Sequence, residues 1–368
     1  MRIGIPKEIK TLESRVSLTP ESVRSLTASG HEVFVETRAG VGSGFPDADY
    51  LAAEAQIVPA AADVFARAEL IVKVKEPQLQ ECDLLGPQHV LFTYLHLAAV
   101  PEIARALCQS GCTAIAYETV TAPTGGLPLL KPMSAVAGRL AVQAGATALQ
   151  KSQGGSGILI SGAAGMAPAK VLILGAGVAG SNAATVALGL QADVTVVDHT
   201  LKNRERVAAE LGLDLNTAAP EQIPELVTDA DLIIGAALVA GASAPKLITR
   251  DMLRRMRPGS VLVDISIDQG GCFETSRPTT LAEPTFVVDG IVHYCVTNMP
   301  GDVPRTSTYA LNHATLPFVQ VLADKGWEQA CQDDPHLANG LNVSGGEICH
   351  SAVEKALRAG AVDDNPPF

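Results

Sequence analysis

His96 stands near the end of an apolar stretch, Phe92–Ala98 (FTYLHLA), that is typical of a buried strand. An imidazole titrates close to neutral pH, so a histidine at this place can carry a proton during a reaction. A lone histidine on an apolar segment is more commonly a hydrogen-bonded core residue. The chemical interpretation therefore depends on other groups in the chain that call for a proton carrier.

Three further polar residues come at or after the ends of predicted strands. Lys75 ends LIVKVK, Asp268 ends VLVDISID, and Arg15 lies in the loop after the first strand. Open α/β sheets bind their ligands at the carboxyl ends of the strands. Taken singly, the two cations also fit solvated surface residues, and Asp268 fits a carboxylate that caps a turn.

A glycine-rich turn follows the strand Val171–Leu174. Gly175, Gly177 and Gly180 have the spacing Gly-x-Gly-x-x-Gly and lead into a predicted helix. In a dinucleotide site the first glycine permits the tight turn, the second lets the pyrophosphate approach, and the third allows close helix–strand packing. The phosphates would lie at the helix N-terminus, where free N–H groups favour anions.

The next predicted strand, DVTVVD, ends in Asp198, where a carboxylate can hydrogen-bond the adenosine ribose. Strand, glycine triple, helix, second strand and terminal acid together predict a dinucleotide site. Asp198 favours NAD over NADP, because a 2′-phosphate would meet a like charge. Lys202 and Arg204 nearby leave NADP open, and Asp198 alone could be a strand-end turn residue.

Two alternating series of strands and helices position these groups. The first series predicts strands at 2–6, 31–37, 70–75, 90–96 and 112–118, with helices at 20–30, 47–55, 60–68 and 101–110. After a linker at 121–129 and a helix at 133–151, the second series predicts strands at 170–174, 194–198, 232–236, 261–268 and 291–296. From residue 306 onward the pattern is helical. Strands joined by helices predict parallel sheets.

We therefore expect an α/β fold of two doubly wound, Rossmann-like domains with a cleft between them. The C-terminal helices are expected to pack back on the first domain. Residues 1–128 would begin the substrate domain, 129–306 would form the NAD-binding domain, and 307–368 would complete the first.

Composition narrows the class of protein. The 368 residues are 47% hydrophobic and 18% charged, which is typical of a globular chain with buried cores. A net charge of −12 argues against nucleic-acid and acidic-membrane partners.

The seven cysteines include no Cys-x-x-Cys pair and the eight histidines no His-x-x-x-His pair, so we expect free thiols and no metal site. The absence of a signal-peptide pattern and of a long apolar run favours a cytoplasmic protein.

The chain resembles the alanine dehydrogenases over essentially its whole length. The stretches that carry the resemblance occur in order: RIGIPKEIK with RVSLTP, LIVKVKEP, LFTYLHLA, IAYETV, PLLKPMSAVAGRLAVQ, LGAGVAG, VLVDISIDQGG, SRPTT and YCVTNMPGDVPRTSTYAL. The soluble NAD-binding part of proton-translocating transhydrogenase shares the GIPKE-like start and the GAGVAG turn. HLA, DQGG and NMPGDVPRTSTYAL point to the dehydrogenase.

The resemblance implies a role for each candidate residue. Arg15 would hold the substrate carboxylate, and Lys75 would assist at the carboxylate or the carbonyl oxygen of pyruvate. His96 would move the proton, and Asp268 would orient water or ammonia and stabilise the cationic imine. Besides the three glycines and Asp198, the resemblance implies that the NAD site is lined by Ser134, Val178, Ala179, Leu238, Val239, Ile265, Ile267, Asp268, Arg277, Val296, Asn298 and Met299.

The implied activity is the reversible, NAD-dependent oxidative deamination of L-alanine to pyruvate and ammonia, in a homo-oligomer expected to be a hexamer. Two alternatives stay open: a transhydrogenase-like NAD(H)-binding subunit, and a non-catalytic NAD(H) sensor. The presence of Arg15, Lys75, His96 and Asp268 favours the enzyme.

Overall fold

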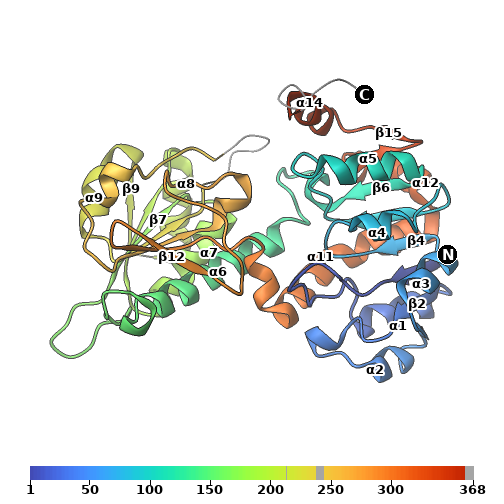
Figure 1. The fold of residues 1–368 in the computed structure, drawn as a ribbon, viewed down its shortest axis with the longest axis horizontal. Helices are drawn as coiled ribbons and strands as arrows, with labels where there is room; N and C mark the ends of the chain where they lie inside the picture. The colour runs from blue at the N-terminus through green and yellow to red at the C-terminus, as the bar shows by residue number, and fades with distance from the viewer. Residues whose placement is uncertain (213, 238–243, 361–368) are drawn as a thin grey trace. The chain divides into compact units, whose positions relative to one another are not determined.

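The computed structural model describes residues 1–212, 214–237 and 244–360. The chain divides into two compact units (Figure 1). Unit 1 comprises residues 1–133 and the segment from 303 onward, and unit 2 comprises residues 134–302. Leu238 and Val239, which were predicted to line the NAD site, lie outside the described residues.

Unit 1 contains an eight-stranded sheet in the order β15-β14-β6-β5-β4-β1-β2-β3. Its strands are β1 (Arg2–Ile5), β2 (Glu32–Glu36), β3 (Gln56–Val58), β4 (Leu70–Val72), β5 (Val90–Thr93), β6 (Thr113–Ala116), β14 (Leu341–Ser344) and β15 (Glu347–Ile348). The strands from β3 to β6 pair in parallel, and β14 pairs antiparallel with β6 and β15. The strand order reverses between β1 and β4, which is where doubly wound sheets bind ligands.

Helices connect the strands of unit 1, and the last part of the chain returns to it. They are α1 (Pro20–Ala28), α2 (Asp47–Leu51), α3 (Ala61–Arg67), α4 (Leu79–Cys82), α5 (Pro101–Ser110), α11 (Pro304–Lys325), α12 (Trp327–Asp333), α13 (Pro335–Ala338) and α14 (Ser351–Gly360). Helix α11 packs against α1 and β4. Figure 1 shows β15, whose colour comes from the red end of the bar, on the side of the sheet where β14 pairs with β6.

Unit 2 contains a seven-stranded sheet in the order β12-β13-β11-β10-β7-β8-β9. Its strands are β7 (Lys170–Leu174), β8 (Asp193–Val197), β9 (Leu215–Ala218), β10 (Leu232–Gly235), β11 (Val261–Asp264), β12 (Thr285–Val288) and β13 (Ile291–Tyr294). Only β12 runs antiparallel among these pairs. The helices are α6 (Lys131–Ala148), whose first three residues belong to unit 1, α7 (Val178–Gly189), α8 (Leu201–Leu211), α9 (Ile223–Asp229) and α10 (Arg250–Leu253). The strand order reverses between β7 and β10, as it does between β1 and β4 in unit 1.

The central strands are buried along their whole length. Every residue of β4 (LIV), β5 (VLFT) and β10 (LIIG) is buried. Continuous apolar strands of this kind are typical of parallel sheets that are covered on both faces. The predicted α/β fold of two doubly wound sheets, with C-terminal helices returning to the first, is confirmed.

Several predicted strands are wrong at their carboxyl ends. The strands predicted at 70–75, 90–96 and 261–268 end at Val72, Thr93 and Asp264. The apolar patterns continue past these points, but His96 has a φ of 50°, which no strand allows, and Asp264 caps a 3₁₀ turn. The sequence interpretation also missed β3, β9, β12 and the hairpin of β14 and β15 in a C-terminal part that was predicted to be helical. These strands are too short to show a clear period.

Within the described ranges, no helix is both long and apolar enough to cross a membrane. All seven cysteines are free thiols. The described residues contain no group of three or more His, Cys, Asp and Glu side chains that could hold a metal ion.

Candidate active site

Arg15 is buried in the loop after β1 and is held by Glu13. The Nε of Arg15 donates to Glu13 Oε1 at 2.7 Å, and its Nη2 donates to Oε2 at 2.6 Å. Its Nη1 donates to the thioether sulfur of Met133 at 3.1 Å. Burial alone lowers the pKa of Arg15, but its hydrogen bonds and charge pairing with Glu13 raise it above the ordinary value. The guanidinium is therefore charged, and its bidentate pairing with the carboxylate of Glu13 fixes its orientation.

Helix α11 fixes the loop that carries Arg15. The backbone N–H of Val16 donates to Thr308 Oγ1 at 3.2 Å, and that of Thr19 donates to Asn312 Oδ1 at 2.5 Å. Thr19 in turn caps α1, because its side chain accepts from the N–H of Ser22. The C-terminal part of the chain thus positions a residue near its beginning.

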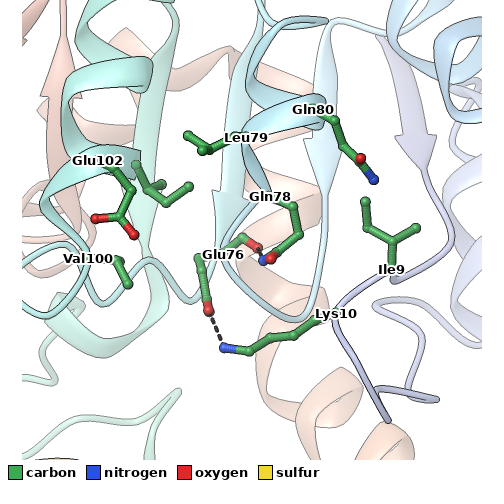
Figure 2. Close-up of a pocket in the computed structure, with 9 residues that line it drawn as sticks. Ile9, Lys10, Glu76, Gln78, Leu79, Gln80, Val100 and Glu102 are labelled. Atoms are coloured by element: carbon green, nitrogen blue, oxygen red, sulfur yellow. Dashed lines mark hydrogen bonds and ion pairs between the residues drawn. The ribbon is translucent and has the colours of Figure 1, made fainter.

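Lys75 lies three residues past β4, and contacts from the end of β5 position it. The hydroxyl of Thr93 donates to the carbonyl of Lys75 at 2.9 Å, and the N–H of Tyr94 donates to Val74 at 3.3 Å. The Lys75 ammonium lies 3.6 Å from Glu76 Oε2. Burial raises the pKa of Glu76, but Lys75 and Lys10 lower it below the ordinary value. Figure 2 shows Lys10 reaching Glu76 in a pocket of about 490 Å³.

Lys73, two residues earlier, is buried among carboxylates. Its ammonium lies 2.8 Å from Glu81 Oε1 and 3.1 Å from Glu8 Oε2. Burial alone lowers its pKa, but the two carboxylates raise it above the ordinary value. The other oxygen of Glu8 accepts the N–H groups of Val74 at 2.6 Å and Lys75 at 3.4 Å. Glu8 therefore anchors the segment that presents Lys75.

His96 is half-buried in the turn after β5. Its backbone N–H donates to Glu118 Oε1 at 2.6 Å. Its ring stacks on Tyr94, with centroids 5.7 Å apart and planes 12° from parallel. The hydroxyl of Tyr94 donates to the carbonyl of Leu129 at 2.6 Å. Arg15, Lys75 and His96 thus follow β1, β4 and β5, which are neighbouring strands of one sheet.

The glycine turn of unit 2 has the geometry that the motif predicts. Gly175 has a φ of 109°, and a Cβ at Gly180 would lie 1.8 Å from the carbonyl oxygen of Gly175. A Cβ at Gly177 would meet nothing within 4 Å. No side chain caps the first turn of α7. The backbone therefore requires glycine at positions 175 and 180. Gly177 instead leaves open space beside the uncapped amides of α7, which fits a bound pyrophosphate.

Asp198 is buried at the end of β8 and organises both neighbouring turns. Its Oδ2 accepts the N–H of Ala176 at 2.9 Å, inside the glycine turn. Its Oδ1 accepts the N–H and hydroxyl of Thr200 at 2.9 and 2.6 Å, and the amide of Asn203 at 3.1 Å. Burial alone raises its pKa, but these hydrogen bonds lower it below the ordinary value. Asp198 is thus a turn-forming residue here, and its contact with a ribose stays a prediction.

Asp268 lies in the 3₁₀ turn η5 (Ile265–Gln269) and is exposed. Asp264 holds this turn, because its Oδ1 accepts the N–H of Ser266 at 3.0 Å and its Oδ2 that of Cys272 at 2.9 Å. Asp268 belongs to unit 2, so its grouping with Arg15, Lys75 and His96 stays a prediction.

The other residues predicted to line the NAD site also belong to unit 2. Ser134 lies in α6, Val178 and Ala179 begin α7, Ile265 and Ile267 lie in η5, Val296 follows β13, and Asn298 precedes the 3₁₀ turn η6 (Met299–Asp302) that Met299 begins. Arg277 is exposed, and its guanidinium lies 4.1 Å from the centre of the Phe286 ring.

Sequence interpretation missed the residues that hold the candidates in place. These are Glu8, Glu13, Tyr94, Glu118 and Met133. Glu13 stands two positions before Arg15, and Glu118 ends the strand predicted at 112–118, so both carboxylates had a visible signal in the sequence. For Met133 no signal exists, because its contact with Arg15 joins residues far apart in the sequence.

Comparisons with known proteins agree along nearly the whole chain. The family models "Alanine dehydrogenase/PNT, N-terminal domain" and "Alanine dehydrogenase/PNT, C-terminal domain" match residues 4–137 and 141–351. An alanine dehydrogenase of Halomonas elongata is 58% identical over 97% of both chains, and one of Mycolicibacterium smegmatis is 53% identical over 97% of both.

Solved structures give the same answer. An L-alanine dehydrogenase superposes with a TM-score of 0.94 at 50% identity, covering 98% of this chain and 99% of the other. A transhydrogenase from Sinorhizobium meliloti superposes with a TM-score of 0.82 at 29% identity, covering 96% and 100%. With both domain models matched and relatives above half identity over nearly its full length, the chain belongs to the alanine dehydrogenase/PNT family.

Proposed function

We propose that this chain oxidises L-alanine with NAD⁺ and water to pyruvate, ammonium, NADH and a proton, and catalyses the reverse reaction. The observation that carries the proposal is the placement of Arg15, Lys75 and His96 after three neighbouring strands, in a chain that is 58% identical to an alanine dehydrogenase. A fixed guanidinium, an ammonium and an imidazole at one sheet edge suit an amino or oxo acid.

Arg15 binds the substrate carboxylate in this proposal. Glu13 occupies its Nε and Nη2, so the guanidinium is oriented before substrate arrives. A charged guanidinium that is already oriented loses little conformational freedom on binding. Lys75 acts at the same carboxylate or at the carbonyl oxygen of pyruvate.

His96 moves the proton as the carbonyl forms or breaks, since an imidazole titrates near working pH. Asp268 orients the water or ammonia and stabilises the cationic imine. When bound, NAD⁺ supplies the acceptor for the hydride that leaves the substrate α-carbon. The protein's own task is to hold the amino acid and exchange protons with it.

Unit 2 binds the cofactor and unit 1 the substrate. The open space at Gly177 and the uncapped first turn of α7 support a pyrophosphate there. The buried carboxylate of Asp198 supports NAD over NADP, because a 2′-phosphate would meet its charge. A cytoplasmic location and a homohexamer complete the proposal, as the family resemblance implies.

The test is NADH formation by the purified protein with NAD⁺ and a panel of amino acids, L-alanine first, repeated with NADP⁺. Turnover of L-alanine with NAD⁺ and little with NADP⁺ is expected. An apolar pocket separates substrates that differ by one methylene by only about 1–3 kcal/mol, so 2-aminobutyrate should react more slowly without being excluded. No turnover with any amino acid, alongside tight NADH binding, would favour a transhydrogenase-like subunit or a sensor.

A further inference from the structure

We propose that Glu118 is the positioning residue of His96: its carboxylate fixes the left-handed turn that presents the imidazole. The inference rests on the proposed function, because it concerns the residue that moves the proton. Glu118 has no role in the reaction scheme above. Its position and its contacts point to a role in holding His96.

The first observation is the way the sheet ends beside His96. Strands β5 and β6 pair in parallel, with Thr93 opposite Ala116 as the last pair. Beyond that pair the chain after β6 turns into η2 (Tyr117–Thr119), so it no longer offers carbonyl groups to the chain after β5. The N–H groups of Leu95 and His96 therefore need another acceptor, because a buried N–H without one is costly.

The Glu118 side chain supplies that acceptor. Its two oxygens lie 3.1 and 3.2 Å from the nitrogen of Leu95, and Oε1 lies 2.6 Å from the nitrogen of His96. Hydrogen bonds to a carboxylate are shorter and stronger than those between neutral groups. One side chain thus binds two successive amides and determines how the backbone turns after β5.

That turn puts His96 in an unusual conformation. Its φ of 50° lies in the left-handed region, which residues other than glycine seldom adopt. Residues held in sparsely populated backbone conformations persist only where the surroundings fix them. The carboxylate of Glu118 does so for the backbone, and the ring of Tyr94 stacks on the imidazole.

The C-terminal hairpin supports the turn that contains Glu118. Asn342 of β14 donates to Thr119 Oγ1 at 2.8 Å, and the N–H of Ala116 donates to the carbonyl of Gly340 at 2.7 Å. The ring of Tyr117 packs edge-on against Tyr94 with centroids 5.1 Å apart. The residues on both sides of Glu118 are therefore held in place, while its own side chain binds the amides of Leu95 and His96.

Three substitutions separate the reach of the side chain from its charge. Glu118→Gln keeps an acceptor oxygen at the same reach and loses the charge, whereas Glu118→Asp keeps the charge and withdraws the acceptor. Glu118→Ala removes both. If positioning is the role, kcat for L-alanine at saturating NAD⁺ falls in the order wild type, Gln, Asp, Ala. The Ala variant should lose on the order of 10- to 100-fold, as expected for a displaced proton carrier.

A matched control and a double variant exclude a general loss of structure. Glu69 also accepts a backbone N–H in unit 1, that of Arg2 at 2.9 Å. It lies just before β4, at the opposite end of that strand from Lys75, so Glu69→Gln should leave kcat unchanged. NADH binding, followed by fluorescence, should be retained in every Glu118 variant. In a His96→Ala background Glu118→Ala should lower the residual rate by less than about two-fold, because the two changes remove one function.

The proposal is overturned if Glu118→Asp is faster than Glu118→Gln, since charge and not reach would then matter. It is equally overturned if Glu118→Ala slows the His96→Ala enzyme as much as it slows the wild type. Should the Ala variant fail to fold, the order of Gln and Asp still decides. A wild-type protein without activity on L-alanine would instead refute the proposed function itself.

Discussion

Units 1 and 2 wind their parallel strands in the same order, but they differ at the point where that order reverses. In unit 1 this point, between β1 and β4, is followed by buried charges: Arg15 paired with Glu13, and Lys73 paired with Glu8 and Glu81. In unit 2 the same point, after β7, carries the glycine turn from Gly175 to Gly180.

The difference shows how one topology can hold two kinds of ligand. The site of unit 1 is made of charged side chains, and each of them contributes to binding. The site of unit 2 is made of backbone, which the ligand can approach only because the glycines have no side chain. Unit 1 should therefore fail when side chains are removed. Unit 2 should fail when even a methyl group is added.

The largest expected effect comes from removing a side chain of unit 1. His96→Ala should lower kcat on the order of 10²-fold or more, because the proton carrier of the reaction is lost. NADH binding should stay near the wild-type value, because the glycine turn lies in unit 2. Steady-state kinetics with L-alanine and an NADH fluorescence titration check both parts, and near-normal turnover would remove His96 from its role.

Adding one methyl group to unit 2 should have the next largest effect. Gly180→Ala places a Cβ 1.8 Å from the carbonyl oxygen of Gly175, so the helix and strand must separate. We expect a loss of about 1–3 kcal/mol of stability, together with weaker NADH binding. Thermal melting and NADH titration measure the two effects. An unchanged melting temperature would show that the turn tolerates the methyl group.

A smaller effect, dependent on pH, is expected at Asp198. Its folded-state pKa is lowered, so its stabilisation is fully present above the unfolded value of about 3.9 and is lost as the pH falls through the folded value. Asp198→Asn should therefore cost about 1 kcal/mol at neutral pH. The difference from wild type should shrink in melting curves recorded at progressively lower pH. A difference that grows on acidification would contradict this sign.

Sequence reasoning succeeded where the structure is local. The glycine turn, its helix and the strand before Asp198 lie within one short segment, so spacing alone predicted their arrangement. The support of the unit 1 residues is non-local: α11 fixes the Arg15 loop, and Glu118, in the turn after β6, reaches across to His96. Such contacts leave no periodic pattern in the sequence.

The same distinction explains the strand ends that were predicted wrongly. The apolar pattern runs through His96 and Ile267, although the backbone has already left the sheet. Each strand ends where a carboxylate accepts the backbone N–H groups in place of the neighbouring strand. This carboxylate is Glu118 in unit 1 and Asp264 in unit 2. Both are acids near a strand end, where a sequence alone does not distinguish a cap from a solvated residue.

The central claim is that the cofactor occupies the open backbone of unit 2, and Gly177→Ala tests it most directly. Apart from its chain neighbours, a Cβ there meets nothing within 4 Å, but Gly177 is the N-cap of α7, where alanine is less favourable than glycine. The melting temperature should therefore fall much less than it does for Gly180→Ala. The methyl group would stand where the pyrophosphate approaches, so NADH should bind about ten-fold more weakly or worse. NADH binding equal to that of wild type would contradict the claim.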